Sequence, residues 1–325
     1  DRSRRYQNWT KFSLSADLLN RPSFFKMVKF GAGLTWQWHS HRHSLNELIP
    51  FRLTYTKLLN TTAEFDETMA NNPAVALSFR NQFIPEIQYN YTYDRSFSGN
   101  QLTYNLQLIE AGNVFAGIWS LCGSNGEKKM FGTPFSQFVK MQTSVVYNHG
   151  VMPGHRLVAR MLVGAAHAYG NSSQVPYSEQ FYIGGANSIR AFAVRSIGPG
   201  SFRPDATNPN GYYDQTGTFK FEANLEYRFP IFSYFKGALF IDAGNVWLLS
   251  DDEKRQGGKL RMKNFFDELA LGTGLGIRFD MDMLVVRADV GYALHAPYET
   301  GKSGYFNMPS FKKSYAFHIA IGYPF

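Results

Sequence analysis

"TFKFEANLEYRF" fills residues 218–229 and alternates, position by position, between two kinds of side chain. One kind is polar or charged: Thr218, Lys220, Glu222, Asn224, Glu226 and Arg228. The other is apolar or aromatic: Phe219, Phe221, Ala223, Leu225, Tyr227 and Phe229. Successive side chains of a β-strand point to opposite faces, so this segment predicts a strand with one apolar face and one polar face. Strands of transmembrane β-barrels alternate in this way, with the apolar face toward lipid and the polar face toward the lumen.

The same alternation recurs along the chain. At the C-terminus the apolar face carries Tyr315, Phe317, Ile319, Ile321, Tyr323 and Phe325. Further strands are predicted near residues 8–18, 28–38, 48–59, 83–94, 101–111, 136–148, 155–169, 235–248, 271–279 and 283–295. Each has about the nine to eleven residues that a tilted membrane strand needs. We therefore predict an all-β fold, a transmembrane antiparallel β-barrel with twelve strands in this chain.

The connections alternate in length. Short turns are expected at residues 97–99, 149–154, 230–233 and 280–282, and long gaps at about 60–82, 112–134, 170–216, 249–265 and 296–312. Outer-membrane barrels place short turns on the periplasmic side and long loops outside. Residues 62–83 have helix-like composition and predict a surface helical insertion. An edge helix of a soluble sandwich is the alternative, and it leaves the large aromatic faces unexplained.

Composition excludes several other classes of protein. Aromatic residues make up 16% of the chain and charged residues only 18%, below the ~25% of ordinary soluble domains. The net charge of +8 is scattered over strands and turns, so we expect no nucleic-acid partner. The single cysteine, Cys122, allows no internal disulfide. The histidines of "HSHRH" (39–43) are interpreted as a solvated turn, and residues 204–214 lack the calcium-loop pattern, so no metal and no cofactor is expected.

The stretch "FYIGGANSIRAFAVRSIGPGSF" (181–202) lies in the longest of the gaps and is not a typical solvated loop. It resembles the lumen-entering loop of the BamA/TamA superfamily of outer-membrane assembly and translocation proteins. The tip of that loop corresponds to Ile189, Arg190, Ala191 and Phe192, with Ala191 where the family usually has glycine. "DAGNVW" (242–247) and the terminal aromatic residue extend the resemblance. Details such as "YIGGANSIRAF" favour the TamA-like branch over BamA.

The resemblance implies a sixteen-stranded barrel in which the loop, here residues 170–216, folds into the lumen. Residues 1–325 would then form strands 5 to 16, with the first strands and the soluble POTRA repeats expected upstream. The tip arginine of the family meets acidic residues on the inner wall, and the matching positions are Glu226 and Asp242. Independently, the alternation turns both side chains inward. A buried arginine needs a paired carboxylate, so we expect Arg190 to lie against these two residues.

The resemblance also implies a function without bond-breaking chemistry. Such a protein is an insertase or translocase in the bacterial outer membrane, whose partners are unfolded outer-membrane client proteins, accessory assembly subunits and membrane lipid. The family opens a weakly paired seam between its first and last strands. The seam strand here would be residues 313–325, with Tyr315, Phe317, Tyr323 and Phe325 against lipid or interfacial headgroups.

Three alternatives stay open at this point. A translocator dedicated to one secreted partner, as in two-partner secretion, has the same features. A passive porin also has a polar lumen but does not need the loop tip with its two acids. An enzyme would need a nucleophile, a base and an orienting group together at the lipid interface, and the histidines offer no such arrangement, so we predict that the protein is not an enzyme.

Overall fold

The computed structural model describes residues 8–21, 24–71, 73–121, 126–203, 215–281, 283–310, 312 and 314–325. Its main feature is one antiparallel sheet of twelve strands. In chain order these are β1 (Trp9–Arg21), β2 (Phe25–His41), β3 (Ser44–Thr61), β4 (Gln82–Phe97), β5 (Asn100–Ala111), β8 (Phe138–Met152), β9 (His155–Ala168), β10 (Phe219–Phe232), β11 (Phe235–Trp247), β12 (Ala270–Asp280), β13 (Val285–His295) and β14 (Tyr315–Ile321). All twelve strands predicted from alternation are present.

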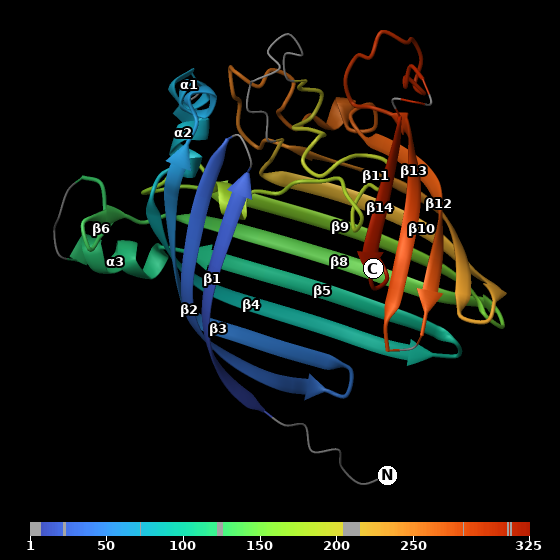
Figure 1. Cartoon of the computed structure of the whole chain (residues 1–325). Coiled ribbons are helices and arrows are strands. Elements are labelled where there is room, and N and C mark those ends of the chain that lie inside the picture. The colour runs from blue at the N-terminus through green and yellow to red at the C-terminus, as the bar shows by residue number, and fades with distance from the viewer. Residues whose placement is uncertain are drawn as a thin grey trace.

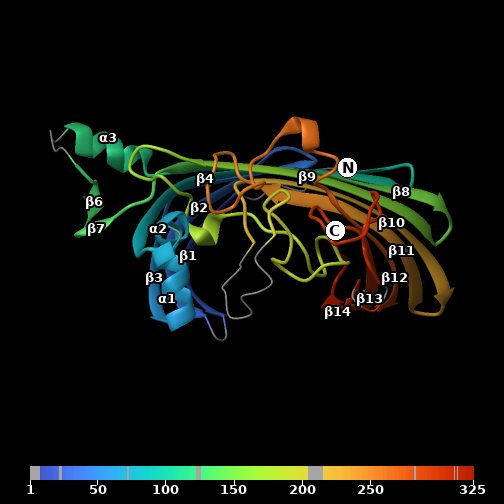
Figure 2. The ribbon, with the colours of Figure 1, turned by 90° about the horizontal axis from the view of Figure 1, so that it is seen from above.

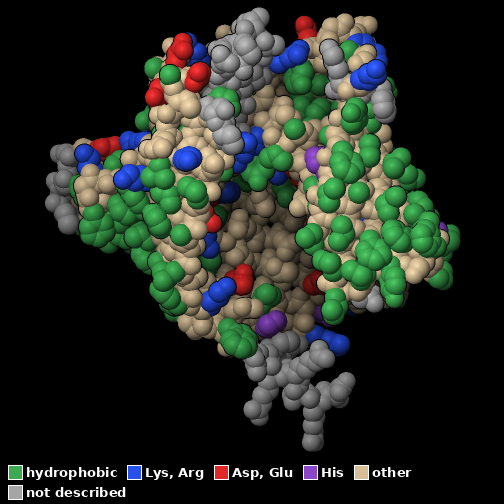
Figure 3. Space-filling view, in the orientation of Figure 1, with side chains coloured by type: hydrophobic (Ala, Val, Ile, Leu, Met, Phe, Trp, Pro, Cys, Tyr) green, Lys and Arg blue, Asp and Glu red, His purple; other side chains and the backbone are tan. Residues whose placement is uncertain are grey.

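Each strand pairs with its neighbour in sequence, so the sheet is a simple meander from β1 to β14. Figure 2 shows that it curves strongly, with the yellow-green segment that follows β9 on its concave side. Among the described residues, β1 pairs with β2 alone and β14 with β13 alone. The sheet therefore has two free edges, and the space-filling view in Figure 3 shows a hollow between them.

The register places the two faces as the alternation predicts. On β10 and β11, Glu226 lies opposite Phe240 and Asn224 opposite Asp242, and these four side chains are buried on the concave side. Leu225, which follows Asn224 in the chain, is exposed on the convex side. A one-residue slip would exchange the two faces, so the strong difference in polarity between them specifies the register.

The connections at one end of the sheet are long and carry the helices (Figure 1). The predicted helical insertion is present as α1 (Ala63–Asn71) and α2 (Pro73–Phe79). The gap after β5 holds α3 (Asn113–Leu121) and a small hairpin of β6 (Lys129–Met130) and β7 (Thr133–Pro134), which the sequence patterns did not indicate. Two 3-10 turns, η1 (Tyr177–Glu179) and η2 (Met262–Asn264), lie in later gaps. No helix in the described part of the chain is long and apolar enough to cross a bilayer.

The core lies inside the curved sheet, where the loop after β9 packs against the inner wall. Phe181, Ile183, Ile189 and Ile197 of the loop are fully or almost fully buried in one apolar cluster. The wall contributes Ile84, Ile109, Phe138 and Val246 to the same cluster. Figure 2 shows the loop in this position. The loop is thus part of the folded core, as predicted for residues that enter the lumen.

The end of the chain differs from the prediction. Tyr315, Phe317, Ile319 and Ile321 point outward and are 55–76% exposed, as expected for lipid-facing side chains. The strand ends there because Gly322 adopts φ +83°, which turns the last residues out of the ladder. Tyr323 donates to Asp280 Oδ2 at 2.6 Å, and the Phe325 ring lies 5.0 Å from Arg160 Cζ. The prediction that Tyr323 and Phe325 face lipid was therefore wrong.

Two sequence features lie outside the described residues: Cys122 and the oxygen-rich stretch 204–214.

Candidate functional site

The loop tip is shaped by a compact turn. Gly184 and Gly185 have φ +92° and +88°, a left-handed conformation that glycine adopts without strain. The Gly185 amide donates to the Phe192 carbonyl at 2.8 Å, and the Phe192 amide donates to the Ile189 carbonyl at 3.1 Å. These bonds fold the tip back on itself. Arg190 therefore points away from the turn and into the inner wall.

The Arg190 guanidinium is enclosed by two carboxylates. Its Nε donates to Asp242 Oδ2 at 2.8 Å and its Nη2 to Asp242 Oδ1 at 2.9 Å, which is bidentate geometry. Its Nη1 donates to Glu226 Oε2. The guanidinium carbon also lies 3.5 Å from the centre of the Phe240 ring, a cation–π contact. All three charged side chains have no exposed surface.

The ion pairs continue along the wall. Glu226 also accepts from Arg228 Nε at 2.7 Å and from Arg278 Nη2 at 3.1 Å. Arg278 pairs with Asp289 at 2.5 Å, and Asp289 pairs with Arg287 at 2.6 Å. Each of these buried charges therefore contacts at least one charge of opposite sign, in a chain that runs from β10 across to β13. Such a network is favourable only when every member has a partner, because an unpaired buried charge is strongly destabilising.

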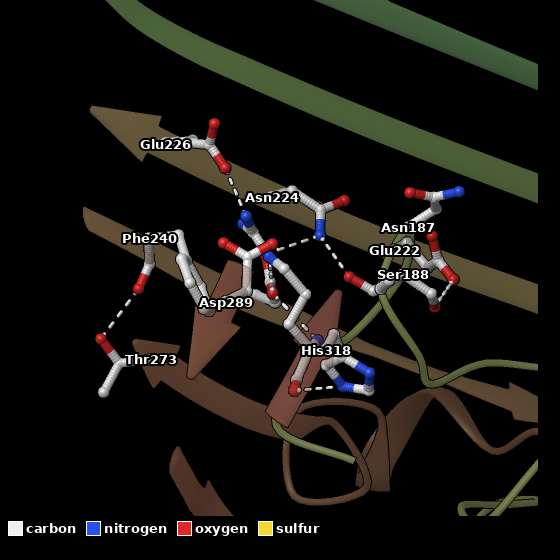
Figure 4. A network of polar contacts seen from close by, with 12 residues as sticks. Asn187, Ser188, Glu222, Asn224, Glu226, Phe240, Thr273, Asp289 and His318 are labelled. Atoms are coloured by element: carbon white, nitrogen blue, oxygen red, sulfur yellow. Dashed lines mark hydrogen bonds and ion pairs between the residues drawn. The ribbon is translucent and has the colours of Figure 1, made fainter. Parts of the chain in front are cut away.

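Four strands also hold the backbone of the tip, and Figure 4 shows the contacts that Asn224 and His318 make with it. Arg160 of β9 donates to the Asn187 carbonyl at 3.0 Å, and Asn224 of β10 donates to the Ser188 carbonyl at 3.0 Å. Arg287 of β13 donates to the Ala186 carbonyl at 2.9 Å. His318 Nε2 of β14 lies 3.0 Å from the Arg190 carbonyl oxygen. The tip is therefore bound by strands from β9 to the free edge at β14.

Inward glycines make the close approach of the tip possible. A Cβ atom at Gly291 would lie 2.4 Å from the Arg190 carbonyl oxygen, and one at Gly272 would lie 2.3 Å from the Ala191 Cβ. These positions tolerate no side chain while the tip is docked. Ala191 stands where the resembling family has glycine, and it is accommodated because β12 has Gly272 opposite it.

The base of the loop makes a second, less buried contact with the other half of the wall. Glu179 of η1 accepts from Lys29 of β2 at 3.3 Å and from Lys140 of β8 at 3.2 Å. Burial by itself would raise the pKa of Glu179, but the two ammonium groups outweigh it, and the pKa lies below its usual value. Beside it, Tyr177 stacks on Phe79 of α2 with ring centres 4.2 Å apart. The loop thus joins the helical insertion to the wall.

The structure brings together the residues singled out from the sequence: Arg190 with Glu226 and Asp242, flanked by buried Ile189, Ala191 and Phe192. Sequence reasoning missed the roles of Arg278, Arg287, Asp289 and His318. Arg278 and His318 occupy positions that the alternation of their own segments turns inward. Their partners, however, depend on cross-strand neighbours that a single sequence does not specify.

Within the described residues, no three His, Cys, Asp or Glu side chains are grouped so that they could hold a metal ion. Its chemistry is electrostatic. The loop tip is fixed inside the wall by buried ion pairs, and removing one member of a pair would leave the other charge buried and unpaired, which is strongly destabilising.

Comparisons with known proteins agree with this architecture. The Omp85 superfamily domain matches residues 3–325. A structure of BamA from Haemophilus ducreyi lacking POTRA domains 1–3 superposes with a TM-score of 0.60 at 14% identity, covering 88% of this chain and 55% of that one. CdiB from Escherichia coli gives a TM-score of 0.55 at 13% identity, covering 97% of this chain and 49% of that one. The chain therefore spans about half the length of these solved chains.

Proposed function

Because the chain belongs to the Omp85 superfamily, whose members insert or transport proteins at the outer membrane, we propose that it inserts unfolded outer-membrane client proteins through a lateral seam. It is an outer-membrane β-barrel protein, and its family consists of insertases and transporters rather than enzymes. The finer assignment to client insertion depends on the residues of the site and of β14.

The observation that carries the proposal is the buried clamp of Arg190 by Glu226 and Asp242. A passive porin needs an open polar lumen and has no use for a loop that is fixed inside it by fully buried ion pairs. A protein whose lumen must stay closed until a client arrives does need such a loop. Without it, solutes would leak through the lumen while the seam is shut.

Strand β14 is the proposed seam. It has seven residues, fewer than any other strand of the main sheet, and within the described residues its outer edge carries no partner strand. Unpaired backbone groups in hydrocarbon cost several kcal/mol each, so a client strand that pairs with this edge would be stabilised there. Strand addition to an exposed edge is a general mode of recognition.

Several finer points belong to the same proposal. These residues would be strands 5 to 16 of a larger barrel, with POTRA repeats upstream and accessory assembly subunits as further partners. We keep the TamA-like branch as the preferred one. CdiB is a two-partner secretion transporter, so a dedicated translocator is the alternative function.

Site-specific photo-crosslinking tests the seam. A photoreactive residue at Phe317 on β14 should capture an unfolded barrel client during insertion. The matched control is Leu239 on β11, which is similarly exposed (52% against 57%) but lies on a strand paired on both sides. Capture at both positions, or at neither, contradicts the seam.

Client choice and conductance distinguish the alternatives. An insertase should crosslink to several unrelated barrel proteins, whereas a dedicated translocator should crosslink to one secreted partner. A porin should pass a steady ion current in planar bilayers. The proposed insertase should be nearly closed, with irregular openings.

A further inference from the structure

Helix α3 and the β6–β7 hairpin form a unit outside the sheet, which we call the lateral unit (residues 113–121 and 126–134). Figures 1 and 2 both show it projecting away from the wall, near the end that carries the long connections. Neither the loop clamp nor the seam involves it. Its side chains are unlike those of a solvated surface element.

The exposed face of α3 is apolar. Val114, Ile118 and Leu121 are 52%, 54% and 89% exposed, and their spacing of four and three residues puts them on one face of the helix. The helix has no charged residue in its sequence NVFAGIWSL. A surface helix in water normally has polar residues on the side away from the core, so this face is adapted to an apolar environment.

The opposite face of α3 is fixed to the protein. The Glu110 carboxylate accepts from the Asn113 amide at 2.6 Å, where the helix begins. Asn113 bonds to Tyr169 and Gln137, Ala116 is buried, and the Phe115 ring packs on Phe135. These contacts fix the orientation of α3, so its apolar face points outward.

The hairpin adds an apolar tip next to the wall. Phe131 is 87% exposed at the turn, and its ring lies 6.0 Å from Phe83 on the outward face of β4. The exposed apolar surface of the lateral unit is thus continuous with the lipid-facing wall. Close to where β5 leads into α3, that wall has an apolar groove of about 430 Å³ whose lining includes Leu108, Val139 and Met141.

Charged residues of the lateral unit gather apart from this surface. They are Glu127, Lys128 and Lys129, which precede and begin β6, so the unit has a net charge of +1. Arg80 lies beside them and pairs with Glu127 at 2.8 Å. Figure 3 shows hydrophobic side chains on the lower side of the projecting unit and Lys and Arg side chains along its upper edge. An apolar side next to a basic edge is typical of elements that lie in a membrane interface.

We propose that the lateral unit lies in the outer leaflet of the membrane, with Val114, Ile118, Leu121 and Phe131 in hydrocarbon and Lys128 and Lys129 at anionic lipid headgroups. Continuity with the lipid-facing wall selects lipid as the occupant. The unit widens the footprint of the barrel on one side, beside β4 and β5, and fixes its depth in the bilayer.

Spin-label accessibility in reconstituted vesicles tests the proposal. The whole protein carries Cys122→Ser and one nitroxide, attached at Ile118→Cys. Leu275→Cys on β12 is the lipid reference, because that side chain is 57% exposed on the outward face. Lys302→Cys in the exposed loop after β13 is the water reference.

The measured quantity is the ratio of accessibility to oxygen over accessibility to a water-soluble nickel complex. We expect the ratio at position 118 to match that at 275 and to exceed that at 302 several-fold. A ratio at 118 equal to that at 302 overturns the proposal. Low accessibility to both reagents would indicate a protein contact and would overturn it as well. Because the side chains of Ile118, Leu275 and Lys302 are exposed, labelling these positions leaves the core intact.

The charged edge has its own test. Adding phosphatidylglycerol to phosphatidylcholine vesicles should raise the ratio at position 118, because anionic headgroups draw the lysines toward the surface. The double substitution Lys128→Gln and Lys129→Gln should abolish that increase. An increase that survives the substitution refutes the assigned role of the two lysines.

Discussion

The two halves of the inner wall are polar in different ways. On β10 to β13 the inward side chains are charged, fully buried and paired, as in the contacts of Glu226, Arg278 and Asp289. On β3 to β5 they are mainly neutral amides and hydroxyls, and those of Asn90, Thr92 and Asn105 are half-buried. There Asn90 accepts from Gln88 at 2.8 Å and donates to Glu47, and Thr92 donates to Asn105 at 3.1 Å.

The difference follows from where the loop tip lies. Under the tip, water is excluded, and a polar wall there is stable only if each charge contacts a partner of opposite sign. Away from the tip, the wall stays in contact with water, so amides that bridge one another are sufficient. The distribution of charge on the wall therefore records which part of the lumen the loop occupies.

Replacing Arg190 with alanine should have the largest effect. It leaves Asp242 with Asn224 as its remaining side-chain donor and removes one of three arginines from Glu226, so we expect a loss of about 3–5 kcal/mol in loop docking. Limited proteolysis of residues 170–203 and a client-insertion assay measure the loss. Membrane location should be unchanged. Undiminished loop protection together with undiminished insertion would contradict the role assigned to Arg190.

Gly291→Ala tests the same half of the wall without changing any charge. The new methyl group would overlap the backbone of Arg190 and Ala191, and overpacking of this kind costs about 1–3 kcal/mol. Faster proteolysis of the loop is expected. The matched control is Gly117→Ala on α3, where nothing lies within 4 Å of the added atom. Equal proteolysis rates in the two variants would argue against the close approach of the tip.

Glu179→Gln tests the contact of the loop with the N-terminal half of the wall, where Lys29 of β2 and Lys140 of β8 donate to Glu179. We expect a loss of about 1–2 kcal/mol, because two charge-assisted hydrogen bonds weaken at a partly exposed site. Since the folded pKa of Glu179 is lowered, its contribution is present above the ordinary glutamate pKa and is lost as pH falls through the lowered value. Protection of the η1 amides, measured as hydrogen exchange relative to the intrinsic rate at each pH, should therefore fall in acid in the parent and be less sensitive to pH in the variant. Parallel pH profiles would exclude Glu179 as the responsible group.

Asn90→Ala should have the smallest effect. The side chain is half-buried and water can replace its hydrogen bonds, so the change in stability should stay within about 0.5 kcal/mol. Thermal unfolding in detergent measures it. A loss as large as that of Arg190→Ala would mean that the two halves of the wall do not differ in the way their structures indicate.

Alternation predicted the strands well because lipid on one side and polar lumen on the other leave a strong period of two. It also turned Glu226 and Asp242 inward, and the family resemblance supplied their partner. The sequence could not predict the pairing of Arg278 with Asp289 or the contact of His318 with the tip, because both depend on register and on a loop that folds back from far away in the chain.

Two local errors have physical causes. At the C-terminus, period two continues through Phe325, but Gly322 adopts a left-handed conformation that an alternation pattern does not reveal. Between Asn113 and Ser120 the segment 113–121 has no polar side chain, so it shows neither the period of a strand nor that of an amphipathic helix. Its helical form became evident only with the capping contact of Glu110 and the packing of Phe115.

The contact between His318 and the Arg190 carbonyl links the loop tip to the outer edge of the sheet. His318 belongs to β14, whose outer edge carries no partner strand within the described residues. A client strand bound at that edge and the docked tip would therefore both contact β14. If occupancy of the edge alters this contact, thermodynamic reciprocity requires that release of the tip alter the affinity of the edge by the same factor. The His318 imidazole would then couple the binding of a client strand at the edge of β14 to the release of the loop tip inside the barrel.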